Sequence, residues 1–199
     1  MIRSRVILLF LCSLAVASCS TKIISNNYYQ ENKETVDNIE NRYEKLNAAK
    51  PFAIAFTDKR LNIISLEMLS DTLTRIYEFN VSEKRLSDTL AKYNYDAAGI
   101  NYLIKKMQQT KVIWINSVDY YVNAQPQQLI YLSIKPITIR YLFSPPKYIA
   151  LGYFRTAQSF DEKGRLLDGR RTKRVRKIKD QVFYRITDRI CYTITDKYR

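Results

Sequence analysis

The stretch Val112–Ile134, VIWINSVDYYVNAQPQQLIYLSI, decides the expected fold, because its apolar residues recur at every second position. This spacing is typical of half-buried strands, whose successive side chains point to opposite faces of a sheet. A polar turn, Ala124–Gln128, contains Pro126 and divides the stretch in two. We therefore expect two antiparallel strands. The residues expected on their buried faces are Val112, Trp114, Val118, Tyr120, Val122, Ile130, Leu132 and Ile134.

Strand patterns continue to the end of the chain. The expected strands are Ile137–Phe143, Tyr148–Phe160 and Val182–Ile194. Pro136 predicts a bulge or bend before the first of them, since proline is confined to such places in a sheet. Ser144-Pro145-Pro146 then breaks the run, and Asp161-Glu162-Lys163-Gly164 has the composition of a hairpin connection.

The first half of the chain predicts a meander followed by helices. Phe52–Thr57, Leu61–Leu69 and Thr72–Asn80 are strand-like and are separated by short polar breaks. Between Ser82 and Gln109 the apolar spacing becomes helical, with Ser82 and Asp96 as expected N-caps of two helices. We expect these helices to cover a sheet.

An amphipathic helix is expected over Tyr28–Ala49, ended by Pro51. We expect its apolar stripe to pack on its own domain; the alternative is a short coiled coil with a partner. Together these elements predict an α+β fold, an antiparallel sheet partly covered by helices, in a single domain over residues 28–199. The two groups of strands form either one sheet or two subdomains divided near residue 110. The stripe consists of Tyr29, Val36, Ile39, Tyr43 and Leu46.

The first eighteen residues have the features of an export signal. Arg3 and Arg5 precede a short apolar run, which is too short to remain comfortably as a membrane-spanning helix. Its end, Val16-Ala17-Ser18-Cys19, resembles the lipobox of bacterial lipoproteins. The resemblance implies cleavage before Cys19, attachment of lipid to its sulfur, and acylation of the new amine by fatty acids such as palmitate.

Two alternatives to a lipoprotein signal stay open. Ala15-Val16-Ala17 offers an ordinary secretory cleavage site, which would leave Cys19 without lipid, and the segment also resembles a short uncleaved anchor. In the lipoprotein interpretation, residues 19–27 form a polar tether. Ser20 follows the cysteine where an Asp favours retention in the inner membrane, so we expect the outer membrane. Whether the domain faces the periplasm or the surface stays undecided.

The charge points to anionic partners. The net charge is +14, and export argues against nucleic acid, which leaves anionic lipid, lipopolysaccharide or acidic glycan, besides an envelope protein. Basic residues concentrate in Lys163–Lys179 and continue into the next strand. The alternative is a solvated hairpin whose charges keep a strand edge from pairing with other chains. The candidate anion-binding residues are Arg170, Arg171, Lys173, Arg174, Arg176, Lys177, Arg185 and Arg189.

Catalytic patterns are scarce. The chain has no histidine, which excludes His-based nucleophile systems and the commonest metal ligand, and no glycine-rich phosphate loop, so neither metal nor cofactor is expected. Cys191 is the one cysteine left after the signal and Cys19, and a buried inert thiol is expected there. Four carboxylates offer glycosidase pairs in principle: Glu67, Asp71, Asp119 and Asp188. Asp188 interrupts a strand face, so it is expected at a strand edge or bulge, or beside an Arg.

Aromatic residues are abundant, with sixteen tyrosines. Trp114 and the pair Tyr120-Tyr121 are candidates for sugar stacking, but neighbours in a strand point to opposite faces and cannot form one platform. Core positions are therefore expected. The sequence as a whole predicts a non-catalytic envelope lipoprotein, an accessory or structural subunit that binds a protein or an anionic polymer. The alternative is an envelope glycan hydrolase.

Overall fold

The computed structural model describes the backbone of residues 2–70, 73–139 and 147–196, and the side chains of residues 22–70, 73–134 and 147–196. The chain divides into two units, residues 1–33 and 34–199. Helix α1 (Ile2–Ala49) runs continuously through both. It therefore includes residues 19–27, expected as a separate tether, in helical form. Asp71, Ser144–Pro146 and the side chain of Cys19 lie outside the described part.

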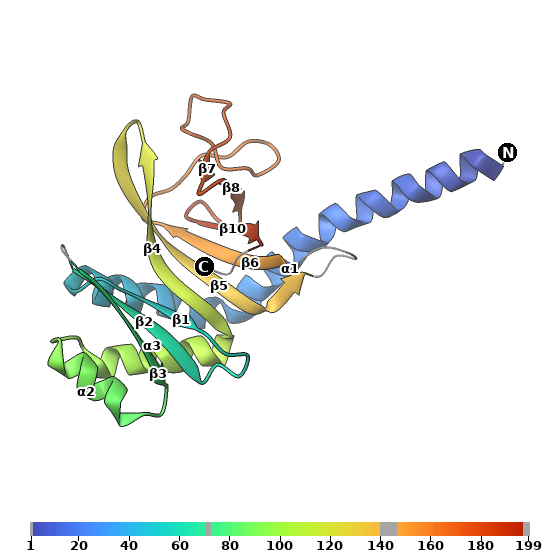
Figure 1. Ribbon diagram of the computed structural model, residues 1–199. Coiled ribbons are helices and arrows are strands. Elements are labelled where there is room, and N and C mark those ends of the chain that lie inside the picture. The colour runs from blue at the N-terminus through green and yellow to red at the C-terminus, as the bar shows by residue number, and fades with distance from the viewer. Residues whose placement is uncertain (1, 71–72, 140–146, 197–199) are drawn as a thin grey trace. The chain divides into compact units, whose positions relative to one another are not determined.

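Residues 34–199 are built on one antiparallel sheet of eight strands in the order β3-β2-β1-β4-β5-β6-β10-β9 (Figure 1). β1 pairs with β4 through Ile54 and Ile115, so the two groups of strands belong to one sheet rather than to two subdomains divided near residue 110. The strands are β1 (Phe52–Phe56), β2 (Ile63–Leu69), β3 (Thr74–Asn80), β4 (Val112–Val122), β5 (Gln125–Ile139), β6 (Lys147–Phe154), β9 (Tyr184–Arg185) and β10 (Ile190–Thr195). β7 (Lys177–Ile178) and β8 (Gln181–Val182) form a separate ribbon. The α+β class is confirmed.

One face of the sheet is covered by helices. In the Glu34–Ala49 part of α1, Val36, Ile39 and Tyr43 are fully buried. The Tyr43 hydroxyl donates a hydrogen bond of 2.6 Å to the Phe52 carbonyl, and the two rings lie 5.1 Å apart. In this part of the helix the apolar stripe packs on the chain's own sheet, as expected.

Two further helices, α2 (Lys84–Lys92) and α3 (Ala97–Thr110), connect β3 to β4. Asp96 caps α3 as predicted, because its carboxylate accepts the Gly99 N–H at 2.8 Å. The predicted cap at Ser82 is wrong. The Ser82 hydroxyl donates to the Asn80 side chain at 2.8 Å, and Glu83 occupies the N-cap position of α2 without a side-chain capping bond.

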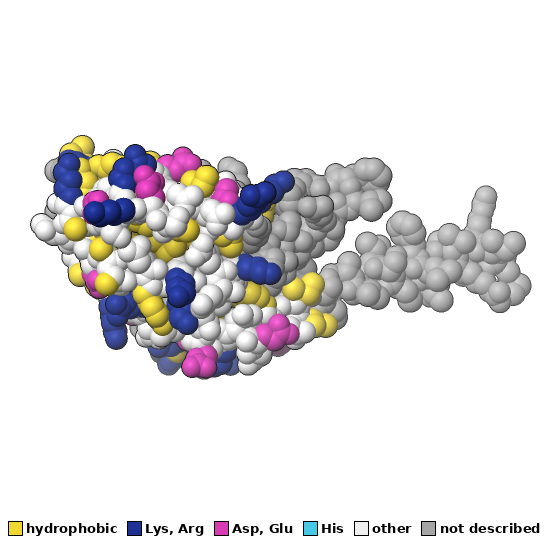
Figure 2. Space-filling model, turned by 90° about the horizontal axis from the view of Figure 1, so that it is seen from below, with side chains coloured by type: hydrophobic (Ala, Val, Ile, Leu, Met, Phe, Trp, Pro, Cys, Tyr) yellow, Lys and Arg dark blue, Asp and Glu magenta, His cyan; other side chains and the backbone are white. Residues whose placement is uncertain are grey.

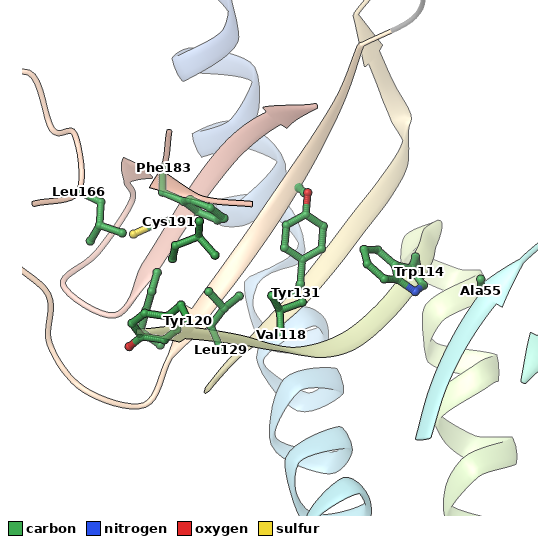
Figure 3. Close-up of a cluster of buried hydrophobic side chains, with 12 residues drawn as sticks. Ala55, Trp114, Val118, Tyr120, Leu129, Tyr131, Leu166, Phe183 and Cys191 are labelled. Atoms are coloured by element: carbon green, nitrogen blue, oxygen red, sulfur yellow. The ribbon is translucent and has the colours of Figure 1, made fainter. Parts of the chain in front are cut away.

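The second face is covered by the C-terminal part of the chain. Because side chains alternate along each strand, Ala55, Trp114, Tyr131 and Phe154 share this face. Leu166, Ile178 and Phe183 pack over it, and Figure 3 shows several of these side chains turned toward one another. Strands β1 and β6 are thus buried on both faces, as strands this apolar require in water, whereas the edge strand β3 is largely exposed.

The turn between β4 and β5 differs from the expected one. Val122 pairs directly with Gln125, so the connection is the two residues Asn123 and Ala124, whose φ angles are 49° and 62°. Positive φ at both central positions is the geometry that matches the twist of a tight hairpin. Pro126 consequently lies within β5, opposite Tyr121. The bulge predicted at Pro136 is confirmed by a register shift between Ile134 and Thr138.

The C-terminal strand predictions were too long. The strand expected over Tyr148–Phe160 ends at Phe154, and the one expected over Val182–Ile194 folds back on itself. Tyr184 pairs with Tyr192, and the carbonyl of Ile190 accepts the N–H groups of Ile186 and Thr187 at 2.9 Å each. The turn contains neither glycine nor proline, and its one signal, Asp188, was interpreted as a bulge, a strand edge or the partner of an arginine.

Gly152 of β6 permits the close approach of Phe183 to the second face. A Cβ atom at Gly152 would lie 2.9 Å from the Phe183 ring, which is fully buried. We expect Gly152→Ala to lower the free energy of unfolding by about 1–3 kcal/mol through overpacking, measured by urea denaturation. Gly169→Ala is the control, since a Cβ there meets nothing within 4 Å. Equal midpoints for the two variants would contradict this packing.

Candidate anion-binding site

Residues 163–179, which we call the basic segment, fold into compact loops that pack over the second face of the sheet. Its first turn follows Asp161, which accepts backbone N–H groups from Lys163 and Arg165 at 3.0 and 2.8 Å, so the predicted hairpin connection is confirmed. The segment then doubles back, with Asp168 N–H bonded to the Arg174 carbonyl at 3.0 Å. The intervening residues 169–173 form an exposed tip, which we call the basic tip.

Arg176 is the one predicted anion ligand that the structure buries, with 6% of its side chain exposed. Its guanidinium lies over the Tyr120 ring at 5.6 Å. Nε and Nη2 donate to the side chain and carbonyl of Asp168 at 3.2 and 2.5 Å, and Nη1 donates to Gln158 at 3.3 Å. A side chain held this firmly links the basic segment to β4, so its main role is structural.

Three other predicted anion-binding residues also form ion pairs or hydrogen bonds within the chain. Arg174 forms an ion pair with Asp168 at 3.4 Å, and Arg185 forms one with Asp188 at 2.7 Å. Arg189 donates from Nε to the Phe154 carbonyl at 3.0 Å. Asp188 thus has the role expected of it as the partner of an arginine.

Four predicted cations are exposed and form no ion pair with any residue of the described chain: Arg170, Arg171, Lys173 and Lys177. Three of them lie in the basic tip. On the face seen in Figure 2, by contrast, Lys and Arg side chains are dispersed among Asp, Glu and apolar groups. The structure therefore reduces the candidate anion-binding site from eight residues to the three exposed cations of the basic tip, Arg170, Arg171 and Lys173.

A cavity of about 480 Å³ adjoins the basic tip. The end of the β4–β5 hairpin forms one wall with Asn123, Gln125 and Gln127, and residues 156–159 and 167–170 form the other. Arg170 of the tip and the buried Arg176 both line it. This cavity was not predicted, since its walls come from segments about 30 to 45 residues apart in the sequence and its shape depends on the short hairpin turn.

A row of aromatic rings in the core ends at Tyr120, which lines the cavity. Trp114 lies 5.3 Å from Tyr131, and further contacts of 6.4, 6.1 and 5.4 Å link Phe183, Phe154 and Tyr120 in turn. Burial raises the pKa of Tyr120, although Arg176 opposes the shift. The expectation of a core position is confirmed for Trp114 and Tyr120. It is wrong for Tyr121, which points to the opposite face and is 68% exposed.

The described candidate acids are not brought together. Glu67 pairs with Ala53 and shares its face of the sheet, whereas Asp119 lies on the opposite face from Tyr120 and accepts a hydrogen bond from Gln128 at 3.1 Å. Asp188 is occupied by Arg185. Within the described residues, no three His, Cys, Asp or Glu side chains gather as metal ligands. Cys191 is free and buried as expected, and burial raises the pKa of its thiol.

A smaller cavity of about 170 Å³ lies near the β2–β3 end of the sheet and was also missed. Lys50, Arg75 and Tyr93 line it. Arg75 lies over the Tyr93 ring at 4.9 Å and donates to its hydroxyl at 2.5 Å. Together with a hydrogen bond from Tyr77, this lowers the pKa of Tyr93.

Comparison with protein-family models, curated proteins and solved structures finds no match for this chain. Over the part that the structure describes, no helix combines the length and the hydropathy needed to span a membrane.

Arg176 and Arg174 share Asp168 as a partner but differ in burial, which makes them a matched pair. Arg176→Ala leaves Asp168 and Gln158 without their buried donor, so we expect a loss of about 1–3 kcal/mol in the free energy of unfolding. Arg174 is 85% exposed. For Arg174→Ala we expect a change of about 0–1 kcal/mol. Urea denaturation measures both, and a larger loss for Arg174→Ala would reverse the assignment.

Proposed function

We propose that the protein is a cell-envelope lipoprotein, anchored through Cys19, whose sheet domain binds an anionic envelope polymer through the basic tip. The polymer is of the lipopolysaccharide or acidic-glycan class. In this proposal the chain acts as a non-catalytic accessory subunit of the outer membrane. The observation that carries it is the group of exposed cations Arg170, Arg171 and Lys173, which form no ion pair with a described residue and lie beside a cavity.

The local charges support binding of an anion at this place. Asp168 is the carboxylate nearest the tip in the sequence, and Arg174 and Arg176 both bind it. Its negative charge is therefore compensated within the fold, and the three tip cations remain available to an external partner. Arginine guanidinium groups bind phosphate and carboxylate oxygens through paired N–H donors, so two of the three are suited to either group.

A hydrolase needs two carboxyl groups that face one another across the scissile bond. Glu67, Asp119 and Asp188 offer no such arrangement, because they occupy different faces or already hold an arginine. No contact in the described part of the chain favours this alternative, so we develop only the binding function.

The lipid anchor is tested by mass spectrometry of the protein purified from membranes. We expect a mature amino terminus at Cys19 that carries the mass of a diacylglyceryl thioether and an amide-linked acyl chain. More than one chain is needed because a single chain gives only marginal membrane residence. An unmodified Cys19, or a freely soluble product cleaved elsewhere, would contradict the anchor.

Polyanion binding is tested by neutralising the basic tip with Arg170→Gln, Arg171→Gln and Lys173→Gln together. Each cation near an anionic surface contributes roughly 1 kcal/mol, so we expect the affinity for lipopolysaccharide to fall by about 100-fold. The wild-type affinity should also decrease as salt is added, and the variant should show a weaker dependence. Surface-based binding measurements over a salt series give both quantities.

The control neutralises three cations remote from the tip, Lys59→Gln, Arg60→Gln and Lys84→Gln. All three are exposed in the β1–β2 turn or at the start of α2. The two triple variants have equal net charge, so a comparable loss in both would show that binding depends on overall charge and not on the tip.

A further inference from the structure

The cavity beside the basic tip offers hydrogen-bonding carboxamide groups in addition to positive charge. On its hairpin wall, the carboxamides of Asn123, Gln125 and Gln127 form no hydrogen bond with any described residue. Gln125 and Gln127 lie on the same side of β5 because they are two residues apart. Each carboxamide offers two N–H donors and one carbonyl acceptor. Such a wall matches a ligand that carries donors and acceptors side by side, as neighbouring hydroxyl groups do.

The opposite wall is already fixed in position. The Gln158 amide donates to the carbonyl and the hydroxyl of Thr156 at 2.9 and 3.2 Å, while its oxygen accepts from Arg176. These bonds determine which way the amide points, and they hold the wall without a ligand. A rigid polar wall reduces the conformational entropy that binding would otherwise cost.

The charges lining the cavity sum to one positive unit. Arg170 and Arg176 are the cations, and Asp168 is the carboxylate, so the balance is +2 − 1 = +1. Asp168 and Arg176 are bound to each other, which leaves Arg170 as the group available to an anion. One guanidinium at the rim of a polar cavity fits a single carboxylate better than a multiply charged phosphate.

The residues that line the cavity favour a polar ligand. About 480 Å³ lies within the roughly 300–1,000 Å³ of small-molecule sites. Most of the lining residues carry amide, hydroxyl or charged side chains, although apolar atoms form the larger part of the cavity surface. The Tyr120 ring already has Arg176 over it. A stacked aromatic ligand therefore finds no free platform there, whereas a polyhydroxylated one finds hydrogen-bonding partners on both walls.

We propose that this cavity binds an acidic sugar, a hexuronic acid unit, with its carboxylate on Arg170 and its hydroxyls on Gln125 and Gln127. The proposal rests on the proposed function, because it names the repeating unit of the anionic polymer that the basic tip contacts. The tip provides electrostatic attraction, and the cavity provides the selection for sugar acids.

The test is calorimetric titration of the full-length lipoprotein in detergent with three probes: a galacturonic acid tetrasaccharide, the neutral galactose tetrasaccharide and inorganic phosphate. We expect the acidic tetrasaccharide to bind, the neutral one to bind at least tenfold more weakly, and phosphate not to compete. Equal affinity for the two tetrasaccharides, or displacement by millimolar phosphate, would overturn the assignment to an acidic sugar.

Two single variants on β5 separate the cavity from the tip. Gln127→Leu removes one amide that faces the cavity, and we expect it to weaken the acidic tetrasaccharide about tenfold. Gln128→Leu is the matched control, since Gln128 points to the other face and binds Asp119 at 3.1 Å. We expect no change in the affinity of that variant. An equal affinity of Gln127→Leu and wild type for the acidic tetrasaccharide would overturn the proposal.

The two proposals fail in different ways. If Gln127→Leu has no effect while neutralising the basic tip still weakens lipopolysaccharide binding, the sugar site is wrong and the polyanion function stands. If neutralising the tip leaves lipopolysaccharide binding unchanged while Gln127→Leu weakens the acidic tetrasaccharide, the cavity is a sugar site and the polyanion function is wrong.

Discussion

The contact of the Arg176 guanidinium with Tyr120, Asp168 and Gln158 joins β4 to a segment that follows it by about 40 to 55 residues in the sequence. Tyr120 belongs to β4, and the other residues belong to the segment that covers the second face of the sheet. A cation buried to this extent is stable only when it is compensated by charge and by hydrogen bonds, and here it has both. The walls of the cavity keep their separation because this contact holds them.

Arg176 is one of several arginines whose charge is used within the fold, so the net charge of the chain does not show which cations are available to a partner. Among the eight cations that the sequence singled out, Arg174, Arg176 and Arg185 are paired with carboxylates, and Arg189 binds a backbone carbonyl. Their charges serve the fold in the first place. Four of the eight form no ion pair in the described chain, and three of these, Arg170, Arg171 and Lys173, lie together in the basic tip beside the cavity.

Local patterns predicted the architecture well and its turns poorly. The period-two spacing of Val112–Val122 and the helical spacing of Ala97–Thr110 follow from burial of one face. The order of apolar and polar residues in the sequence shows this burial directly. The position of the Asn123–Ala124 turn was missed because proline favours turns, so the prediction centred the turn on Pro126. In the structure Pro126 instead lies within β5, near the end of the hairpin and opposite Tyr121. The hairpin at Thr187–Arg189 was missed because Asp188, its one residue favoured in turns, was interpreted as a bulge, a strand edge or the partner of an arginine.

Less of the candidate site could be predicted. The basic segment was visible as a run of charges, but pairing is a property of the folded chain, and nothing in the run distinguishes Arg176 from Arg174. The carboxamides Gln125 and Gln127 carry no pattern of their own. They face a cavity only because a two-residue turn places them opposite residues 156–159 and 167–170.

The central claim is that the C-terminal segment is a fixed wall over the sheet and not a loose basic loop. Hydrogen–deuterium exchange on the intact protein tests it most directly, because the N–H groups of Leu166, Leu167, Asp168 and Arg176 are all bonded within the fold. The account predicts slow exchange at these four amides and fast exchange at Arg170 and Arg171 in the tip. Exchange at the rate of an unstructured peptide throughout residues 165–176 would contradict it.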